Sequence, residues 1–391
     1  MNLEVVSLGC RLNLSESERL RAFLPQDQDL VVINSCAVTA EAVRQTRQAI
    51  RKARRERPHA RLLVTGCAAE IERSAIAAMP EVDGLIANAA KLDPRSWNVG
   101  PCPPRADQAR HSRAFVAVQN GCDHACTFCV IPQGRGNSRS LAIEPVLQEI
   151  ELSVQRGAGE VVLTGVDLTS WGQDLPGTPR LGRLVAAILA AFPQLERLRL
   201  SSVDGIEIDP LLFELIASEA RVMPHVHLSL QHGNDLILKR MKRRHLRGDA
   251  VRLVQSLKAK RPEIAIGADL IAGFPTEDDA AHTDNLSIIS ELGIVHGHVF
   301  PYSPRPGTPA ARMPQVASAL IKARAAELRT AVAEQRTVWL SAQIGQPLSV
   351  LAERDGTGHA PNFARVQLPP ATPAGSIVTV TPTRIIEGLL A

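Results

Sequence analysis

The sequence is poor in aromatic residues and has no long apolar run. Aromatic side chains make up 3% of the 391 residues, too few for the ring-lined platform on which single-stranded bases stack. No apolar stretch reaches the length of a membrane span, and the N-terminus lacks the basic and then apolar pattern of an export signal. We therefore expect a cytoplasmic protein with no membrane partner.

A large excess of one charge is also missing, because the formal net charge is only +4. The basic residues are nevertheless concentrated in two segments, residues 44–61 and 239–247. On a helix, one basic face of the first segment would carry Arg44, Arg47, Arg51 and Arg54. Most charge runs are solvated helix faces. Two such runs around one candidate site make phosphate-backbone binding an equal alternative.

Cysteines are few, but six of the seven fall into two groups. The denser group is Cys122-x-x-x-Cys126-x-x-Cys129. A 4Fe–4S cluster normally takes four thiolates, so three thiolates hold a cluster with one open iron. The alternatives are ordinary buried thiols or a zinc site with His124 as fourth ligand, although a ligand trapped between two cysteines strains a tetrahedron. The spacing favours the cluster.

The other group, Cys10, Cys36 and Cys67, is spread over the first part of the chain at separations of 26 and 31 residues. Such separations are close to one strand-helix-strand repeat. Each cysteine follows an apolar strand-like stretch within three residues, and these stretches are residues 3–7, 30–34 and 61–65. Isolated cysteines are normally core residues. Parallel strands would instead bring all three to the carboxyl edge of one sheet and form a second three-cysteine site.

Residues 93–112 are rich in Pro and Gly and predict a linker, in which Cys102 is incidental. A second strand-helix series follows. Its strand candidates are residues 115–119, 160–164, 197–200, 225–229, 264–269 and 296–300, with helix-like stretches such as 144–155, 181–191, 210–218 and 276–292 between them. From residue 348 the chain alternates apolar and polar residues. The predicted fold class is α/β, with an N-terminal doubly wound parallel-sheet domain, a central partial (β/α)6 barrel and a small C-terminal β-barrel-like domain.

Polar and small residues recur where the central strands end. Thr164 and Gly165 follow one strand candidate, Ser202 follows the next, and Gln231 follows another. Glycine lets a backbone approach a ligand closely, and hydroxyl and amide groups can bind ribose or an amino-acid head group. Turns after strands often contain such residues, so the argument rests on their recurrence along one rim.

The first cysteine group, with Phe128 before its last cysteine, resembles the radical S-adenosylmethionine enzymes, in which the open iron takes the amino and carboxylate groups of S-adenosylmethionine. The run from Asn120 to Ser140, with Gly134-Arg-Gly136, resembles the methylthiotransferase branch. Cys10, Cys36 and Cys67 match its auxiliary cluster site. The C-terminal β unit resembles the small RNA-binding barrel of that branch.

The flanks of the N-terminal cysteines are most similar to family members that modify threonylcarbamoyladenosine in tRNA. They read Ser7-Leu-Gly-Cys-Arg-Leu-Asn13, Asn34-Ser-Cys-Ala-Val-Thr39 and Val64-Thr-Gly-Cys67. The segment from Gly165 to Thr169 is similar as well. Ser35 and Ala37 replace the commoner threonines, and the C-terminal β unit is short. The implied reaction adds a methylthio group to N6-threonylcarbamoyladenosine beside the anticodon.

The resemblance implies three domains: residues 1–95 with the auxiliary cluster, 108–335 as the radical domain, and 338–391 as a TRAM-like RNA-binding unit. The implied cofactors are two 4Fe–4S clusters and S-adenosylmethionine. One electron from the cluster at Cys122, Cys126 and Cys129 would produce a 5′-deoxyadenosyl radical, and the auxiliary cluster would supply the sulfur. The implied cofactor-binding residues are Phe128, Thr164, Gly165, Ser202 and Gln231.

The implied partners are the tRNA anticodon stem-loop and an electron donor such as flavodoxin or ferredoxin, with no DNA. Isopentenyladenosine in tRNA and an aspartate of a ribosomal protein are the alternative substrates within the family. A non-catalytic iron–sulfur or zinc protein that binds RNA is the alternative outside it. Such a protein would never cleave S-adenosylmethionine.

Overall fold

The computed structural model describes residues 3–98 and 112–391. Cys102 and most of the predicted linker lie outside these residues. By their contacts the described residues form two compact units. Unit 1 comprises residues 3–98, 120–139 and 303–311, and unit 2 comprises residues 112–119, 140–302 and 312–391. Unit 1 therefore contains all six cysteines of the two predicted groups.

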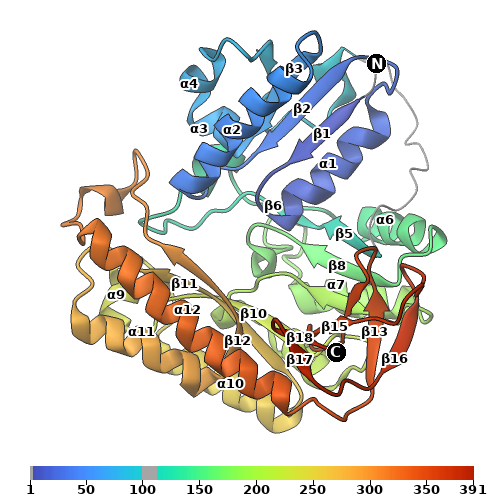
Figure 1. Ribbon diagram of the computed structural model, residues 1–391, viewed down its shortest axis with the longest axis vertical. Helices are drawn as coiled ribbons and strands as arrows, with labels where there is room; N and C mark the ends of the chain where they lie inside the picture. The colour runs from blue at the N-terminus through green and yellow to red at the C-terminus, as the bar shows by residue number, and fades with distance from the viewer. Residues whose placement is uncertain (1–2, 99–111) are drawn as a thin grey trace. The chain divides into compact units, whose positions relative to one another are not determined.

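Unit 1 is built on a four-stranded parallel sheet in the order β1-β2-β3-β4 (Figure 1). Its strands are β1 (Glu4–Ser7), β2 (Leu30–Ser35), β3 (Arg61–Gly66) and β4 (Gly84–Leu85), and its helices are α1 (Arg11–Phe23), α2 (Ala40–Glu56), α3 (Cys67–Ile71), α4 (Arg73–Ala77), α5 (Ile131–Arg135) and the 3-10 turn η1 (Pro94–Trp97). Ser7 pairs with Asn34, and Asn34 pairs with Thr65. The strand ends are thus level, as the cysteine positions predict.

Helices cover both faces of this sheet, because successive residues of a strand point to opposite faces. On one face, Leu20 of α1 packs in a cluster with Val5 and Val32. On the other face, Ile50 of α2 packs in a cluster with Ile33. The predicted three-layer arrangement of the N-terminal domain is confirmed.

Unit 2 contains six parallel strands in two three-stranded sheets, β5-β8-β9 and β10-β11-β12. A parallel bridge between Val203 and Leu228 connects β9 to β10. The strands are β5 (Arg113–Ala117), β8 (Glu160–Thr164), β9 (Leu198–Leu200), β10 (His225–Gln231), β11 (Ala265–Ala272) and β12 (Ile294–Pro301). The two-residue strands β6 (Gln119–Asn120) and β7 (Arg139–Ser140) are separate from this series. The six parallel strands confirm the predicted partial barrel.

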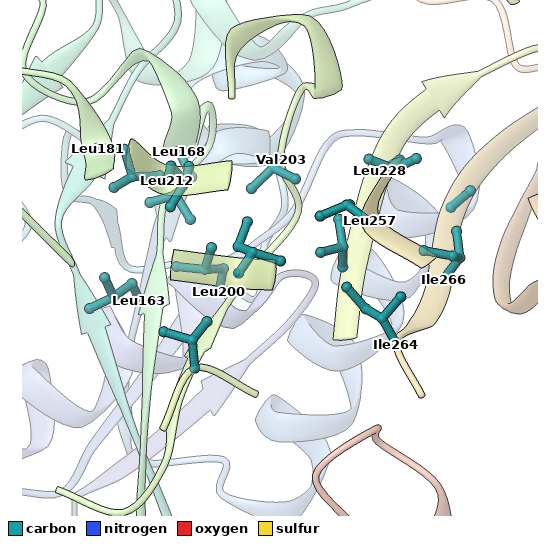
Figure 2. Packing of buried hydrophobic residues seen from close by; sticks show 14 of the residues in the cluster. Leu163, Leu168, Leu181, Leu200, Val203, Leu212, Leu228, Leu257, Ile264 and Ile266 are labelled. Carbon is teal, nitrogen blue, oxygen red and sulfur yellow. The ribbon is translucent and has the colours of Figure 1, made fainter. Parts of the chain in front are cut away.

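Helices follow these strands and cover their apolar face. They are α6 (Ile143–Gln155), α7 (Leu181–Ala191), α8 (Pro210–Ser218), α9 (Asp235–Arg240), α10 (Arg247–Lys260), α11 (Asp279–Leu292) and α12 (Ser318–Ser341). Figure 2 shows how their side chains meet those of the strands: Leu212 of α8 and Leu257 of α10 belong to the same cluster as Leu200 and Ile266. Burial of this apolar face is the main source of stability in the unit.

Local sequence determines where several of these helices begin. The Asp209 carboxylate accepts from the Leu212 backbone N–H at 3.1 Å, and Pro210 occupies the first turn of α8. Asp278 likewise accepts from the Ala281 N–H at 2.8 Å at the start of α11. Side-chain caps of this kind satisfy backbone donors that a helix cannot pair internally. No helix within residues 3–98 and 112–391 has both the length and the apolar composition needed to cross a membrane.

The C-terminal part of unit 2 is a six-stranded, mostly antiparallel sheet in the order β16-β13-β14-β15-β18-β17. Its strands are β13 (Leu348–Ala352), β14 (Thr357–His359), β15 (Arg365–Gln367), β16 (Ile377–Val380), β17 (Ile385–Ile386) and β18 (Leu389–Leu390). Arg199 of β9 pairs with the buried Glu160 carboxylate at 2.8 Å and also donates to the Pro361 carbonyl at 3.0 Å. This pair anchors the C-terminal sheet to the parallel strands.

An aromatic group lies beside that anchor. The Phe363 ring stacks on His225 at 5.0 Å between centroids and on His359 at 4.5 Å. His296 of β12 meets Phe363 and Trp339 edge to face. Burial and the charge of Arg336 lower the pKa of His296 to about 3. This histidine is therefore neutral in the folded protein at neutral pH.

The buried His296 predicts a loss of stability on mild acidification. Its pKa is lower in the folded state than its ordinary value of 6.5, so below that value the unfolded state binds a proton that the folded state does not. The free energy of unfolding should fall by about 2 kcal/mol for this group between pH 7.5 and pH 5. For His296→Phe, the decrease in the free energy of unfolding between the two pH values, measured by urea denaturation, should be smaller than in the wild type by this amount. The exposed residue His59 provides the control His59→Gln, whose decrease should equal that of the wild type; an equal decrease in His296→Phe would contradict the assignment.

Candidate functional site

The first three predicted thiols lie where the parallel strands of unit 1 end. Cys10 precedes α1, Cys36 follows β2, and Cys67 is the first residue of α3. Cys36 and Cys67 are buried, whereas Cys10 is exposed. A Cβ atom on Gly9 would lie 2.6 Å from both Cβ and Sγ of Cys36. Only glycine permits the chain before Cys10 to approach Cys36 so closely.

The segment 120–139 of unit 1, which carries the other three cysteines, packs against Cys67. A Cβ atom on Gly134 would lie 3.2 Å from the Cys67 Cβ atom. The Gly134 carbonyl accepts from the Asn88 side-chain amide at 2.6 Å, and the same amide lies 3.9 Å from the Cys67 Sγ atom. The two cysteine groups therefore belong to one packed region of unit 1.

The two buried thiols, Cys36 and Cys67, need nearby positive charge if they are to act as ligands, because metals bind the thiolate. Burial raises the pKa of Cys36 to about 11. Burial also raises the pKa of Cys67, which the charges of Arg135 and Lys91 oppose. The charges of Arg135 and Lys91 thus offset part of the effect of burial on Cys67, whose pKa still lies above its ordinary value.

These cations belong to a buried ion cluster centred on Glu16 of α1. Lys91 Nζ lies 2.5 Å from Glu16 Oε2, and Arg135 Nη1 lies 2.9 Å from Glu16 Oε1. The side chains of all three residues are 2% exposed. Although burial opposes ionisation, Lys91 and Arg135 hold the pKa of Glu16 below its ordinary value. Burial lowers the pKa of Lys91, and its contact with Glu16 counteracts that effect. With one carboxylate and two cations, the cluster carries one surplus positive charge.

The guanidinium of Arg135 also links the segment 120–139 to helix α1. It donates to Asn120 Oδ1 at 2.8 Å and to the side-chain oxygen of Asn13. The Asn13 amide in turn donates to the Leu8 carbonyl at 2.7 Å and the Ser35 carbonyl at 3.0 Å. Arg135 therefore connects the loop that carries Cys122, through Asn13, with the chain segments next to Cys10 and Cys36.

The loop of the denser group is held by its own backbone. The Cys122 N–H donates to the Gly136 carbonyl at 3.1 Å, and the Cys129 N–H donates to the Cys126 carbonyl at 3.2 Å. Backbone N–H groups of His124 and Ile131 each lie 3.4 Å from a cysteine Sγ atom, those of Cys122 and Cys129. Such donors stabilise thiolates. All three cysteines are partly exposed, which leaves them accessible to a ligand.

The spacing of the thiols separates a zinc site from a cluster. Zinc holds its thiolates at about 2.3 Å, which places their sulfur atoms about 4 Å apart. Within residues 3–98 and 112–391, neither set of three cysteines has all three sulfur atoms within 4.8 Å of one another. Thiolates that bind separate irons of one 4Fe–4S cluster can lie farther apart. In each set, therefore, at least two sulfur atoms lie farther apart than the ligands of one zinc ion.

The predicted cofactor-binding residues of unit 2 lie at neighbouring strand ends. Thr164 ends β8 and is buried, Ser202 follows β9 and is half-buried, and Gln231 ends β10 with a positive φ of 71°. Gly165 follows β8, and a Cβ atom there would lie 2.9 Å from Gln119 Oε1. That oxygen accepts the backbone N–H groups of the next two residues at 3.0 and 2.9 Å. Phe128 belongs to unit 1 and is half-buried in the cysteine loop.

The two basic segments differ in the structure. In the first, Arg44, Arg47 and Arg51 line a surface cavity of about 400 Å³ together with Arg305 and Glu72. Arg54 is instead bonded to the Asp83 carboxylate and to backbone carbonyls, so it does not belong to this surface. The first segment keeps three exposed or half-buried arginines around one concave surface.

The second basic segment is used largely within unit 2. Arg243 donates to Asp204 at 2.8 Å, and Arg244 donates to Glu207 at 2.7 Å. Arg247 bonds to the Gly233 and Asp284 carbonyls. These three arginines are thus engaged within unit 2, and of them only Arg244 keeps a largely exposed side chain.

Sequence reasoning missed Glu16, Lys91 and Arg135. Arg135 belongs to the motif Gly134-Arg-Gly136, but the motif alone assigns it no role. Asn13 and Glu16 follow Cys10 and are three residues apart, so on a helix they lie on the same face. That spacing was the available signal. The contact between Glu16 and Arg135 spans 119 residues, so no local pattern could reveal it.

Two models of known families match this chain, and each covers one of the two cysteine groups. A model of the radical SAM superfamily matches residues 116–286, and one described as uncharacterized protein family UPF0004 matches residues 2–87. Among solved structures, a radical S-adenosylmethionine methyltransferase, TsrM, from Kitasatospora setae aligns with a TM-score of 0.54 at 17% identity, covering 76% of this chain and 68% of the other. That similarity shows the fold alone.

Full-length relatives have more specific names. The threonylcarbamoyladenosine tRNA methylthiotransferase MtaB of Rickettsia prowazekii (strain Madrid E) is 43% identical over 99% of this chain and 96% of its own length. Its namesake from Aquifex aeolicus (strain VF5) is 32% identical over 97% of this chain and 100% of its own length. A tRNA-2-methylthio-N(6)-dimethylallyladenosine synthase of Erythrobacter litoralis (strain HTCC2594) is 31% identical over 90% of this chain and 86% of its own length.

The ion cluster predicts a large stability change from a small substitution. Glu16→Gln removes the carboxylate and leaves two buried cations without their partner, which should lower the free energy of unfolding by roughly 3–5 kcal/mol. Urea denaturation of the full-length protein measures this change. The matched control is Glu56→Gln, which removes a carboxylate that is 60% exposed and 3.8 Å from Lys52. The control should lose less than about 1 kcal/mol, and equal losses in the two variants would contradict the structural role of Glu16.

Proposed function

The chain belongs to the radical S-adenosylmethionine methylthiotransferase family, and from this premise we propose that it adds a methylthio group to N6-threonylcarbamoyladenosine next to the anticodon of tRNA. The observation that carries the proposal is the presence of two separate sets of three thiols in one compact unit. One set would serve radical formation, and the other would serve sulfur transfer. The names of the relatives at 43% and 32% identity support the choice of substrate.

Cys122, Cys126 and Cys129 would hold one 4Fe–4S cluster, and Cys10, Cys36 and Cys67 would hold a second. When bound, the first cluster supplies the electron that cleaves S-adenosylmethionine, and the second supplies the sulfur that is transferred. The thiols require a compensating cation at the second site, and Arg135 and Lys91 provide it. Because Arg135 also binds Asn120, the charge that supports one set of thiols is attached to the loop that carries the other.

The strand ends of unit 2 would bind the nucleoside and head group of S-adenosylmethionine. Gly165 lets Gln119 approach the backbone after Thr164 closely, and Gln119 fixes the turn that follows. Ser202 and Gln231 end the neighbouring strands, and the Phe128 ring would lie against the adenine. A polar rim on parallel strands is a common position for such ligands.

The concave basic surface of unit 1 would contact the tRNA backbone. Arg44, Arg47 and Arg51 line it with Arg305, and guanidinium groups bind phosphates through several donors at once. We also propose that the electron comes from a flavodoxin or ferredoxin and that the protein works in the cytoplasm, where tRNA is found.

A dimethylallyladenosine substrate is the second candidate, because a synthase of that name is 31% identical over 90% of this chain. The proposed and alternative substrates differ at the group on N6 of the same adenine. Chemical analysis of the tRNA distinguishes them directly.

Deleting the gene should remove one modified nucleoside from total tRNA. We expect mass spectrometry of the digested tRNA to show loss of the methylthio derivative of threonylcarbamoyladenosine and accumulation of its unmodified precursor. The wild-type gene on a plasmid should restore the derivative. Loss of the dimethylallyl derivative instead would establish the second candidate, and an unchanged tRNA profile would direct attention to a ribosomal-protein substrate.

Single cysteine substitutions should separate the two chemical steps. Cys126→Ala should abolish cleavage of S-adenosylmethionine, because the loop loses one of its three thiolates. Cys36→Ala should retain slow cleavage and form no methylthiolated tRNA. Both reactions are followed by liquid chromatography of 5′-deoxyadenosine and of tRNA nucleosides.

The seventh cysteine supplies the control. Cys102→Ala changes the same atom at a position outside both sets and should leave both products at wild-type levels. If Cys126→Ala still cleaved S-adenosylmethionine, or if Cys36→Ala still transferred sulfur, the assignment of the two sets would be wrong.

A further inference from the structure

Three side chains converge on the face of the unit 2 strands that points away from the helices. They are His227 of β10, Asp269 of β11 and His298 of β12. Their neighbours in the strands, such as Leu228 and Leu270, belong to the apolar cluster on the helix side. A Cβ atom on Gly297 would lie 2.5 Å from Val332 of α12, so residue 297 also points to the helices. Because strand residues alternate, the three polar side chains share the opposite face.

The donor atoms of these side chains are close together. His227 Nε2 lies 3.1 Å from Asp269 Oδ1, and His298 Nδ1 lies 3.2 Å from the same oxygen. One ligand atom from each residue lies within 4.8 Å of the other two. The two imidazole rings lie 4.5 Å apart at an angle of 36°. Two ring nitrogens and one carboxylate oxygen therefore surround a common point.

A glycine makes this approach possible. His227 pairs with Gly267 across β10 and β11, and a Cβ atom on Gly267 would lie 2.3 Å from His227 Nδ1. Any other residue at position 267 would displace the imidazole ring. The absence of a side chain lets His227 lean over β11 and place its other nitrogen beside Asp269. The backbone pairing of Asp269 with His298 completes the arrangement.

The separations are typical of ligands around one ion. Both N···O distances lie at the long end of the range of ordinary hydrogen bonds, about 2.7–3.2 Å. Ligand atoms about 2.0–2.2 Å from a common metal ion lie about 2.8–3.1 Å from one another in octahedral geometry and about 3.3–3.6 Å in tetrahedral geometry. The observed distances of 3.1 and 3.2 Å lie at and just above the octahedral values.

We propose that His227, Asp269 and His298 form a binding site for one divalent transition-metal ion, separate from the two cysteine sites. Two imidazoles and a carboxylate are a donor set that binds Fe²⁺ or Zn²⁺ and leaves further coordination positions open. The His227 side chain is 7% exposed, whereas that of His298 is 62% exposed. The open positions are therefore on the His298 side, where water or an oxygen ligand from solvent can complete the coordination.

Zinc binding to the intact, cluster-loaded protein tests this site. Zn²⁺ is redox-inert, so it can be added under anaerobic conditions and counted by elemental analysis after gel filtration. The wild-type protein should retain about one zinc ion per chain, and X-ray absorption at the zinc edge should show nitrogen and oxygen neighbours at about 2.0–2.2 Å and no sulfur. Unchanged iron content would confirm that zinc has not displaced a cluster.

Two variants should each remove one proposed ligand and leave the protein folded. His298→Ala changes a largely exposed side chain, and Asp269→Asn keeps the shape of the carboxylate while removing its charge. Each should bind zinc at least tenfold more weakly than the wild type, in line with the loss of one ligand from three. His59→Ala, at an exposed position in unit 1, should bind zinc as the wild type does.

Three results would overturn the proposal: no retained zinc in the wild type, zinc with sulfur neighbours, or equal zinc binding in the wild type and both variants. The first result would leave a hydrogen-bonded His-Asp-His group without a metal. Because none of the six cysteines takes part, these outcomes do not depend on whether the protein cleaves S-adenosylmethionine. Failure of the metal site and failure of the proposed enzymatic function are thus distinguishable.

Discussion

The packing of unit 1 depends on one buried carboxylate, that of Glu16. Two cations approach it within 2.5 and 2.9 Å in a region that water barely reaches. Burying three charges is costly, and an apolar cluster of similar volume would often be at least as stable. The ion cluster instead fixes the position of the segment 120–139. Arg135 can satisfy Glu16, Asn13 and Asn120 only when the segment 120–139 lies against α1 in one register. The two sets of thiols are brought together by this requirement.

The same ion cluster bears on whether the buried thiols could hold the proposed metal cofactor. Burial raises the pKa of Cys36 and Cys67 even in the presence of these cations, whereas a metal cluster needs thiolates. The surplus positive charge of the ion cluster is unfavourable beside neutral thiols and favourable beside an anionic group. An anionic cluster held by these thiolates, as proposed, would therefore be stabilised by the surplus charge of the ion cluster. Gly9 and Gly134 contribute by removing side chains that would fill the space next to Cys36 and Cys67.

Much of the fold could be predicted because its pattern is local. The residues preceding Cys10, Cys36 and Cys67 are apolar over strand length, and the helices that follow have clear periodicity, so level parallel strands were expected. The predicted bounds 181–191 and 210–218 agree with α7 and α8. Arg243 and Arg244 could not be interpreted in this way, because their partners Asp204 and Glu207 lie 37 to 40 residues away and come together only in the folded chain. A charge run identifies cations and says nothing of the carboxylates that neutralise them.

The histidines of unit 2 were missed for a related reason, and their arrangement divides one face of the sheet into two regions. Toward the beginning of the strands, His225 and His296 are covered by the Phe363 ring and are part of the packing with the C-terminal sheet. Two residues farther along each strand, His227 and His298 face Asp269. A shift of two residues keeps a side chain on the same face. Histidine therefore has a packing role at one level of the strands and is available to bind a metal ion at the next. The side of the sheet that faces the helices keeps its apolar core at both levels.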